Sequence, residues 1–330
     1  MEGVKPTISV KANRIANEAG PEAASAFADA AEVLEEHGQK TRLAGLFAFG
    51  VLLCAAFWTQ LYALIRYAAE NSLHSHVLLV PFISGYLIYL QRSVLPKTCR
   101  CSPALGATML ALGVAAFGLA SQMRAGLSPG DYLSFIAFSF VTLLISGAFL
   151  FLGREWVFAV LFPIAFLYFI VPLPDGVAYW METILKLGSA EAAGCFFGLA
   201  GTPMLRDGVI LQLPNITLEV AQECSGIRSS WVLFITSVVA SYLLLKSPWR
   251  RGVLLAVVIP LAILRNGFRI LVIGLLCVRL GPHMIHSFLH ESGGPIFFAL
   301  SLLPLFLLLW WLRKGEGRRK NTYEHITPSI

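Results

Sequence analysis

Three short stretches in the C-terminal half of this chain carry reactive or charged side chains, although the surrounding sequence is strongly apolar. A cysteine thiolate is a nucleophile, and a histidine transfers protons near neutral pH. An arginine inside apolar sequence is costly to insert, so it normally has a partner or a function. A thiol, a guanidinium and an imidazole together indicate a candidate catalytic site. The stretches are "AQECSGIRSS" (221–230), "LRNGFRI" (264–270) and "HSFLHESGG" (286–294).

Cys224 comes just before a predicted membrane span, where Ser225 and Gly226 are suitable N-cap residues. The positive end of a helix dipole and its free amides favour a thiolate at this position. Arg228, one turn into the helix, adds positive charge nearby. The alternatives are a buried structural cysteine and a disulfide with Cys195, which would block the thiol. We expect Cys224 to be a free thiol.

The second stretch lies in a predicted span that begins at residue 252 on the cytoplasmic side. At 1.5 Å per residue, Arg269 lies about 25 Å along this helix, close to the outer surface. Arg265 and Asn266 precede it by four and three residues, which places each on a shared face with Arg269. Each arginine within a span costs on the order of 3 kcal/mol to insert. For Arg265, an alternative is that the side chain extends to the lipid headgroups.

The third stretch belongs to the loop before the last predicted span, which holds His283, His286 and His290. A single histidine there is most often an interfacial residue with an ordinary hydrogen bond. Near a thiol and an arginine at the same membrane depth, a histidine is a candidate general acid and base. His286 and His290 also have the i, i+4 spacing of two zinc ligands. The sequence has no HExxH motif and no clear third ligand, so we expect no metal.

The composition indicates an integral membrane protein. Of the 330 residues, 57% are hydrophobic and 13% are charged, whereas about a quarter of the residues in a soluble domain are charged. Apolar runs of about 20 residues, the length of a membrane-spanning helix, recur along the chain. The net charge of +6 is not accompanied by interleaved aromatic and basic residues, so nucleic acid is not an expected partner.

Eight membrane spans are predicted, and the basic residues of the loops set their orientation. Lys and Arg gather before the first span, in two short loops and after the last span, which places both termini in the cytoplasm. Residues 1–42 form a cytoplasmic extension with a short helix that ends at Gly38, and residues 313–330 form a basic cytoplasmic tail. The spans cover 43–65, 77–91, 104–122, 132–152, 156–173, 229–245, 252–277 and 294–312.

Residues 174–228 are predicted to form a small cap on the outer face of the membrane. Within it, residues 177–200 are apolar enough to suggest a ninth span, but Glu182, Lys186 and Glu191 interrupt them. A ninth span would also place the next basic loop outside, against the charge rule. We therefore expect a helix that lies at the interface or re-enters the membrane.

After this helix, residues 206–221 partly alternate between apolar and polar side chains, which is typical of β-strands. Turn signals stand at Asp-Gly (207–208) and Pro-Asn (214–215), so a β-hairpin is predicted. The expected fold is an all-α polytopic membrane protein of about eight transmembrane helices, with a small extracytoplasmic cap that contains an interfacial helix and a β-hairpin. Its membrane-embedded domain covers residues 43–312.

The three stretches resemble motifs of the exosortase and archaeosortase family of membrane-embedded transpeptidases, and the similarity covers most of residues 43–312. "ECSGIRSS" is similar to the cysteine motif of that family, "RNGFR" to its Asn-x-x-Arg motif, and "HESGG" to its His-x-x-x-Gly motif. Upstream, "SHVLLVPFISGYLIYLQR" (75–92) is similar to its His-x-x-x-x-Pro segment, and "VPLPDG" to its proline-rich loop.

The resemblance implies a cysteine transpeptidase that works without a cofactor. In this reading Cys224 is the nucleophile, Arg269 stabilises the oxyanion, and His290 is the general acid and base. An asparagine next to the arginines would orient one of these groups, and a second arginine would favour the thiolate. The supporting residues are Arg228, Asn266 and Ser225.

The resemblance also implies the substrates. These are secreted proteins with a C-terminal sorting signal that consists of a short motif such as Pro-Glu-Pro, a transmembrane helix and a basic tail. The enzyme would reside in the inner (cytoplasmic) membrane as a multi-pass protein, with its site facing the periplasm or the cell exterior. It would transfer the cleaved protein to a membrane lipid, to a glycan acceptor or to water.

Two other classes of protein remain open at this stage. The first is a membrane transporter or a protein that handles lipid-linked glycans, in which the charges line a path. Such proteins usually place ionisable residues near mid-bilayer on several spans, whereas here the charges gather near one face. The second is a membrane metallopeptidase, which the histidine pair at 286 and 290 suggests.

Overall fold

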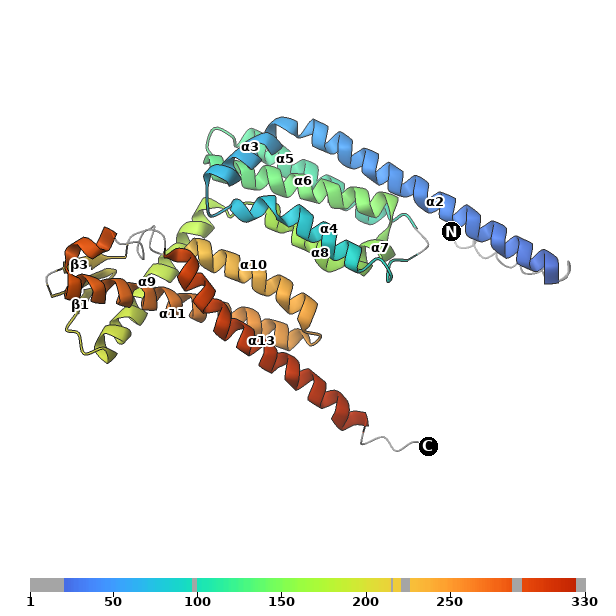
Figure 1. Ribbon diagram of the computed structural model, residues 1–330. Helices are drawn as coiled ribbons and strands as arrows, with labels where there is room; N and C mark the ends of the chain where they lie inside the picture. Colours follow the sequence, from blue (N-terminus) through green and yellow to red (C-terminus); the bar gives the residue numbers. More distant parts are fainter. Residues whose placement is uncertain (1–20, 97–99, 215, 221–225, 287–292, 325–330) are drawn as a thin grey trace. The chain divides into compact units, whose positions relative to one another are not determined.

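The computed structural model describes residues 21–96, 100–214, 216–220, 226–286 and 293–324. The chain is mostly helical and divides into two compact units, Met1–Leu173 and Pro174–Ile330 (Figure 1). Five helices are long and apolar enough to cross a membrane, or up to seven spans exist if each of two bent helix pairs counts as one. A polytopic all-α membrane protein is therefore observed, but the expected number of eight spans is not confirmed.

The first unit is built around α6 (Pro129–Phe151), most of whose side chains are buried. α5 (Pro103–Gln122) packs closely against it because Gly106 and Gly113 have no side chain at the contact. Ser139 of α6 donates a hydrogen bond to the carbonyl oxygen of Gly113 at 2.7 Å, and Ser146 does so to that of Gly106 at 2.9 Å. Small residues and hydroxyl bonds of this kind hold membrane helices together where lipid supplies no hydrophobic driving force.

We expect Gly113→Leu to destabilise the protein because a Cβ at this position would lie 2.7 Å from Cγ of Leu143 and 3.3 Å from its backbone nitrogen. Overpacking of this kind costs about 1–3 kcal/mol. Thermal unfolding of the purified protein in detergent measures the loss. The matched control is Gly118→Leu on the same helix, where a Cβ would meet nothing within 4 Å. Equal melting temperatures for the two variants would contradict this packing.

The predicted first span is divided between two helices. α2 (Pro21–Ala56) and α3 (Trp58–Glu70) meet at Phe57 with a bend of 75°. The Phe57 ring packs against Phe117 of α5 and Phe140 of α6, at centroid distances of 5.3 and 5.7 Å. These contacts hold the bent segment against the two helices. The prediction that the N-terminal helix ends at Gly38 is wrong, since α2 continues through it. Glycine weakens a helix interior by about 1 kcal/mol but ends a helix mainly where the chain turns left-handed.

Two other predicted spans differ from the structure. Residues 77–91 contain a short 3-10 helix, η1 (Ser75–Leu78), followed by α4 (Val80–Leu90). At 1.5 Å per residue α4 is about 16 Å long, too short to cross a bilayer core of about 30 Å. Residues 156–173 are broken into several short pieces. These pieces are α7 (Arg154–Ala159), α8 (Leu161–Phe166) and the 3-10 helix η2 (Leu167–Ile170).

The second unit is organised along α11 (Pro248–Leu280), which has 33 residues and is therefore about 50 Å long. α9 (Asp175–Leu199) lies against it in the same chain direction, and glycines allow close contact at three levels. A Cβ on Gly188 would meet Ile263, one on Gly267 would meet Ala192, and one on Gly274 would meet Phe197. The segment predicted as an interfacial or re-entrant helix is thus a long helix packed along α11.

The predicted β-hairpin is a three-stranded antiparallel sheet in the order β1-β2-β3. The predicted turn at Asp207-Gly208 is present, whereas Asn215 of the second predicted turn lies outside the described residues. The prediction missed one strand because β1 is too short to show a clear alternation. Leu211 and Leu218 face each other across the sheet and pack with Phe197 of α9 and Ile270 of α11. The sheet therefore covers the C-terminal half of α11. The strands are β1 (Leu205–Asp207), β2 (Ile210–Leu213) and β3 (Ile216–Glu219).

The N-terminal half of α11 packs with α10 (Ile227–Leu244) and α13 (Gly294–Glu324). Figure 1 shows these three helices running side by side in the second unit. Their shared core is aliphatic, and this packing fixes where α10 begins relative to α11. The core consists of Leu233, Leu245, Leu254, Val258, Leu305, Leu309 and Leu312.

Candidate active site

The start of α10 is fixed to α11 through one backbone carbonyl. Gly226 is the N-cap of α10 and has φ 70° and ψ 13°, in the left-handed region. Its oxygen accepts hydrogen bonds from the Ser230 amide at 3.0 Å, from the Ser229 and Ser230 hydroxyls at 3.1 and 2.8 Å, and from Arg265 at 3.3 Å. A Cβ on Gly226 would lie 3.0 Å from the guanidinium of Arg265 and 3.2 Å from the amide group of Asn266. Glycine is therefore required here both by conformation and by space.

Arg265 is buried, with 7% of its surface exposed. One terminal nitrogen donates hydrogen bonds to the Gly226 oxygen and, at 3.2 Å, to the hydroxyl oxygen of Ser230. The other, Nη1, has no hydrogen-bond partner among the described residues. The alternative that this side chain extends to the headgroups is wrong, because the acceptors on α10 hold it inside the helix packing.

Asn266 is 2% exposed, and its side-chain nitrogen donates a hydrogen bond to the hydroxyl oxygen of Ser189 at 3.0 Å. Ser189 belongs to α9, so this asparagine links α9 and α11 at the level where α10 begins. The local structure thus brings three helices together around Gly226, Arg265 and Asn266. The orienting role predicted for Asn266 remains a prediction.

Arg269 lies one turn beyond Arg265 on α11 and is half-buried. Its neighbour Phe268 makes edge-on ring contacts with Phe196 of α9 and Phe297 of α13, each at a centroid distance of 6.4 Å. The first turn of α13 is therefore held against α11 beside Arg269. Arg228 of α10 is exposed. Cys224, Ser225 and His290 lie outside the described residues, so their roles remain predictions.

Cys195, the alternative disulfide partner of the candidate nucleophile, is a free and exposed cysteine on α9. His283 is exposed in the 3-10 helix η4 (Pro282–His286), which follows α11. The backbone of His286 ends the same turn. The described residues of the predicted site therefore belong to its arginine–asparagine part.

The first unit contains a buried histidine that was not among the residues predicted for the site, although its segment resembles the His-x-x-x-x-Pro segment of the family. His76 is 8% exposed, and its Nδ1 lies 3.2 Å from the carbonyl oxygen of Leu73. Burial lowers the pKa of His76, more than its backbone hydrogen bonds raise it. His74 beside it stacks on Tyr67 at a centroid distance of 5.3 Å. The spacing His-x-x-x-x-Pro was the available signal, because Pro81 lies in the first turn of α4, directly after this 3-10 turn.

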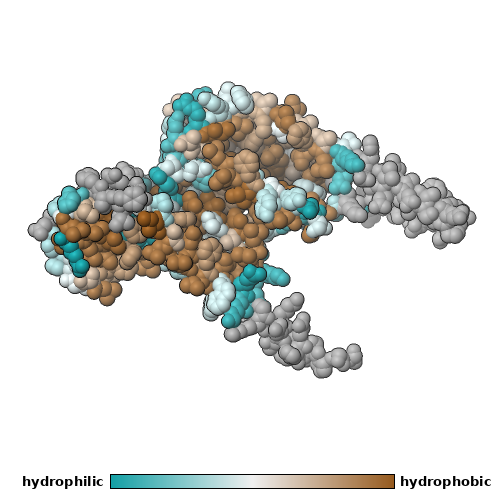
Figure 2. Space-filling view, in the orientation of Figure 1, coloured by the Kyte–Doolittle hydropathy of each residue, from teal (hydrophilic) through white to brown (hydrophobic). Residues whose placement is uncertain are grey.

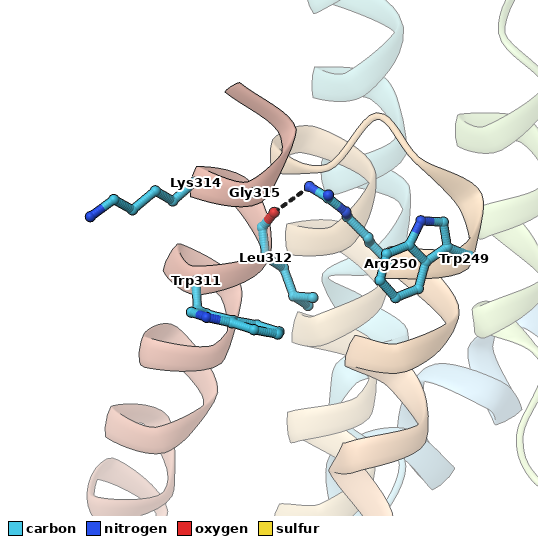
Figure 3. Close-up of a pocket in the computed structure, with 6 residues that line it drawn as sticks. All are labelled: Trp249, Arg250, Trp311, Leu312, Lys314 and Gly315. Atoms are coloured by element: carbon cyan, nitrogen blue, oxygen red, sulfur yellow. Dashed lines mark hydrogen bonds between the residues drawn. The ribbon is translucent and has the colours of Figure 1, made fainter. Parts of the chain in front are cut away.

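A hollow of about 220 Å³ lies at the other end of α11, beside Trp249 and Arg250 (Figure 3). Arg250 precedes Arg265 by fifteen residues, which corresponds to about 22 Å along the helix. The hollow is therefore separate from the arginine–asparagine cluster.

Arg265→Ala is expected to lower stability clearly, because it removes two hydrogen bonds between α10 and α11 and leaves a cavity. Hydrogen bonds contribute about 1 kcal/mol each, and a core cavity adds to the loss, so we expect roughly 2–4 kcal/mol. Thermal unfolding in detergent measures it. Arg279→Ala, an exposed arginine on the same helix, is the matched control and should melt like the parent. An unchanged melting temperature for Arg265→Ala would show that these bonds do not hold the two helices.

One protein-family model matches most of the chain. The model described as transmembrane exosortase (Exosortase_EpsH) matches residues 58–307, about three quarters of the chain. The match runs from the start of α3 into α13 and includes all three stretches. The protein is a multi-pass membrane protein with a membrane transpeptidase-type function. It belongs to the transmembrane exosortase family. No curated protein and no solved structure matches the chain.

Proposed function

We propose that this protein is a cysteine transpeptidase that cleaves the C-terminal sorting signal of exported proteins and transfers them to an acceptor. The observation that carries the proposal is the hydrogen bond from buried Arg265 to the Gly226 carbonyl, together with the neighbouring Asn266. It fixes the start of α10, two residues after Cys224, at the level of an arginine cluster on α11. The family match favours this activity over the transporter and metallopeptidase alternatives.

Covalent geometry supports the meeting of the three proposed groups. Cys224 precedes Gly226 by two positions, and a chain spans at most about 3.6 Å per residue. His290 precedes buried Gly293 by three residues, and the helix that follows packs its first turn beside Arg269. Connectivity therefore limits how far the proposed thiol and imidazole can lie from the elements that position the arginines.

In the proposed reaction the Cys224 thiolate attacks the carbonyl carbon of the scissile peptide bond and gives a tetrahedral oxyanion. Arg269 stabilises this oxyanion as a charged hydrogen-bond donor. His290 protonates the leaving amine, the C–N bond breaks, and a thioester remains on Cys224. The acceptor then loses a proton to His290 and attacks the thioester, which releases the product and regenerates the thiolate.

The proposed substrate is a protein with a Pro-Glu-Pro-type motif, a transmembrane helix and a basic tail. Such a tail would stay on the cytoplasmic side, where basic residues collect, while the motif emerges at the opposite face. Arg269 lies twenty-one residues from the start of α11, about 31 Å along the axis, which suits a site near that opposite face. The acceptor is a membrane lipid, a glycan or water, and the membrane is the inner membrane of the cell.

Co-expression with a reporter that ends in this tripartite signal tests the proposal. The expected result is a shortened reporter and a released helix–tail fragment, both identified by mass. A reporter with the motif replaced by alanines but with the same helix and tail is the control and should stay intact. A reporter that remains full-length beside well-expressed protein would overturn the proposed function.

A further inference from the structure

A hollow at the basic end of the second unit lies between the first turn of α11 and the outer part of α13. Trp249 and Arg250 border it from α11, and Trp311, Leu312 and Lys314 border it from α13. Figure 3 shows the Arg250 guanidinium directed at the carbonyl oxygen of Leu312, with the Trp311 ring below and Lys314 extending outward. With a volume of about 220 Å³, it is smaller than the roughly 300–1,000 Å³ of pockets for drug-sized ligands. It therefore suits one part of a larger molecule.

Positive charge surrounds this hollow. The nearby basic residues lie directly after α10, at the start of α11 or in α13. In the described part of the chain, Glu316 is the acidic residue that lies among them. The Glu316 carboxylate accepts hydrogen bonds from the amides of Lys246 at 3.1 Å and Ser247 at 2.8 Å, and its charge offsets part of the positive charge of Arg250 and Lys246. The basic residues are Lys246, Arg250, Arg251, Arg313 and Lys314.

Arg250 and Arg251 differ in how many of their N–H donors are hydrogen-bonded. Arg251 donates to the carbonyl oxygen of Leu245 at 2.7 and 2.9 Å and so closes the end of α10. Arg250 is 6% exposed and donates one hydrogen bond, at 2.6 Å to Leu312, among the described residues. A guanidinium has five N–H donors, so Arg250 has donors left for an anion in the hollow.

The apolar part of the lining is aromatic and exposed. Trp249 is 54% exposed and Trp311 is 65% exposed. Exposed tryptophans are enriched at the level of lipid headgroups, where the ring meets both acyl chains and water. In Figure 2, hydrophilic residues border hydrophobic surface near the point where α13 leaves its neighbours. The hollow thus combines a cationic rim with an apolar wall at an interfacial depth.

We propose that this hollow binds an anionic phospholipid. The phosphate would accept hydrogen bonds from Arg250 and Lys314, and the upper part of one acyl chain would lie against Trp249 and Trp311. Charge complementarity selects the anionic headgroup, and basic pockets between membrane helices are known to suit such headgroups. Gly315 keeps the hollow open, because a Cβ there would lie 3.2 Å from the Arg250 guanidinium.

Native mass spectrometry of the full chain in detergent, with equal amounts of phosphatidylglycerol and phosphatidylcholine, tests this proposal. The expected result is preferential retention of phosphatidylglycerol by one copy of the chain. Lys314→Gln should weaken retention about fivefold, since one basic contact near a membrane surface contributes about that factor. Gly315→Leu fills the hollow without changing charge and should abolish the preference.

Arg313→Gln is the matched control, because it removes one positive charge next to the lining residues but outside the lining. It should retain phosphatidylglycerol like the parent. The proposal is overturned if both lipids are retained equally, if Arg313→Gln loses as much as Lys314→Gln, or if inorganic phosphate alone displaces the lipid. A second copy of the chain in place of the lipid would equally contradict it.

Discussion

Cys224→Ala is expected to abolish processing of the tripartite reporter, with a rate at least about 10⁴-fold below the parent. The reason is that alanine offers no atom that can form the acyl-enzyme, so the acceptor would have to attack the peptide directly. Cys224→Ser should be similarly inactive, because a hydroxyl is a far weaker nucleophile than a thiolate at neutral pH. The measurement is the fraction of reporter shortened per unit of folded enzyme.

The matched control for this prediction is Cys195→Ala. Cys195 is a free cysteine of the second unit and lies exposed on α9, outside the arginine–asparagine cluster. It should process the reporter like the parent. Parental activity in Cys224→Ala, or equal losses in both variants, would rule out Cys224 as the nucleophile.

The second large effect is expected for Arg269. Removing one donor to an oxyanion typically lowers kcat by about 10²–10³-fold, and we expect this loss for Arg269→Gln. Arg269→Lys should recover little, because an ammonium does not reproduce the planar, forked donors of a guanidinium. The loss should appear in kcat more than in KM, since the oxyanion exists in the transition state and not in the bound substrate.

Thermal unfolding separates this catalytic role from a structural one. Arg269 is half-buried, whereas Arg265 is buried, so Arg269→Gln, which keeps a polar side chain, should lose less stability than Arg265→Ala. Arg279→Gln, exposed on the same helix, should keep both activity and stability. An Arg269→Gln protein that is stable and fully active would exclude the arginine from the reaction.

The sequence was sufficient to predict the arginine–asparagine face of α11. Charged residues inside an apolar span have few structural explanations, so Arg265, Asn266 and Arg269 stood out. Ser225 and Gly226 were both predicted as possible N-cap residues, since helix starts have recognisable residue types, and the structure has Gly226 there. The direction of the Arg265 side chain was not predictable, because it depends on the Gly226 carbonyl and the Ser230 hydroxyl of another helix.

The membrane spans were predicted less well, for physical reasons that particular residues illustrate. Hydropathy averages over about 20 residues and does not detect a break such as that at Phe57, which depends on packing against α5 and α6. The same averaging merged the short helices within 156–173 into one span. The hollow beside Arg250 was also not predicted, since it requires α11 and α13 to be placed side by side.

A covalent thioester at Cys224 is the most direct test of the proposed mechanism. The purified protein would be incubated with the tripartite substrate, quenched in acid, and measured by intact and peptide mass spectrometry. We predict a mass increase equal to the substrate's N-terminal portion, located on the peptide that contains Cys224 and removed by hydroxylamine. Cleavage of the substrate with the label on another residue, or with Cys224 still open to alkylation at every time point, would contradict it.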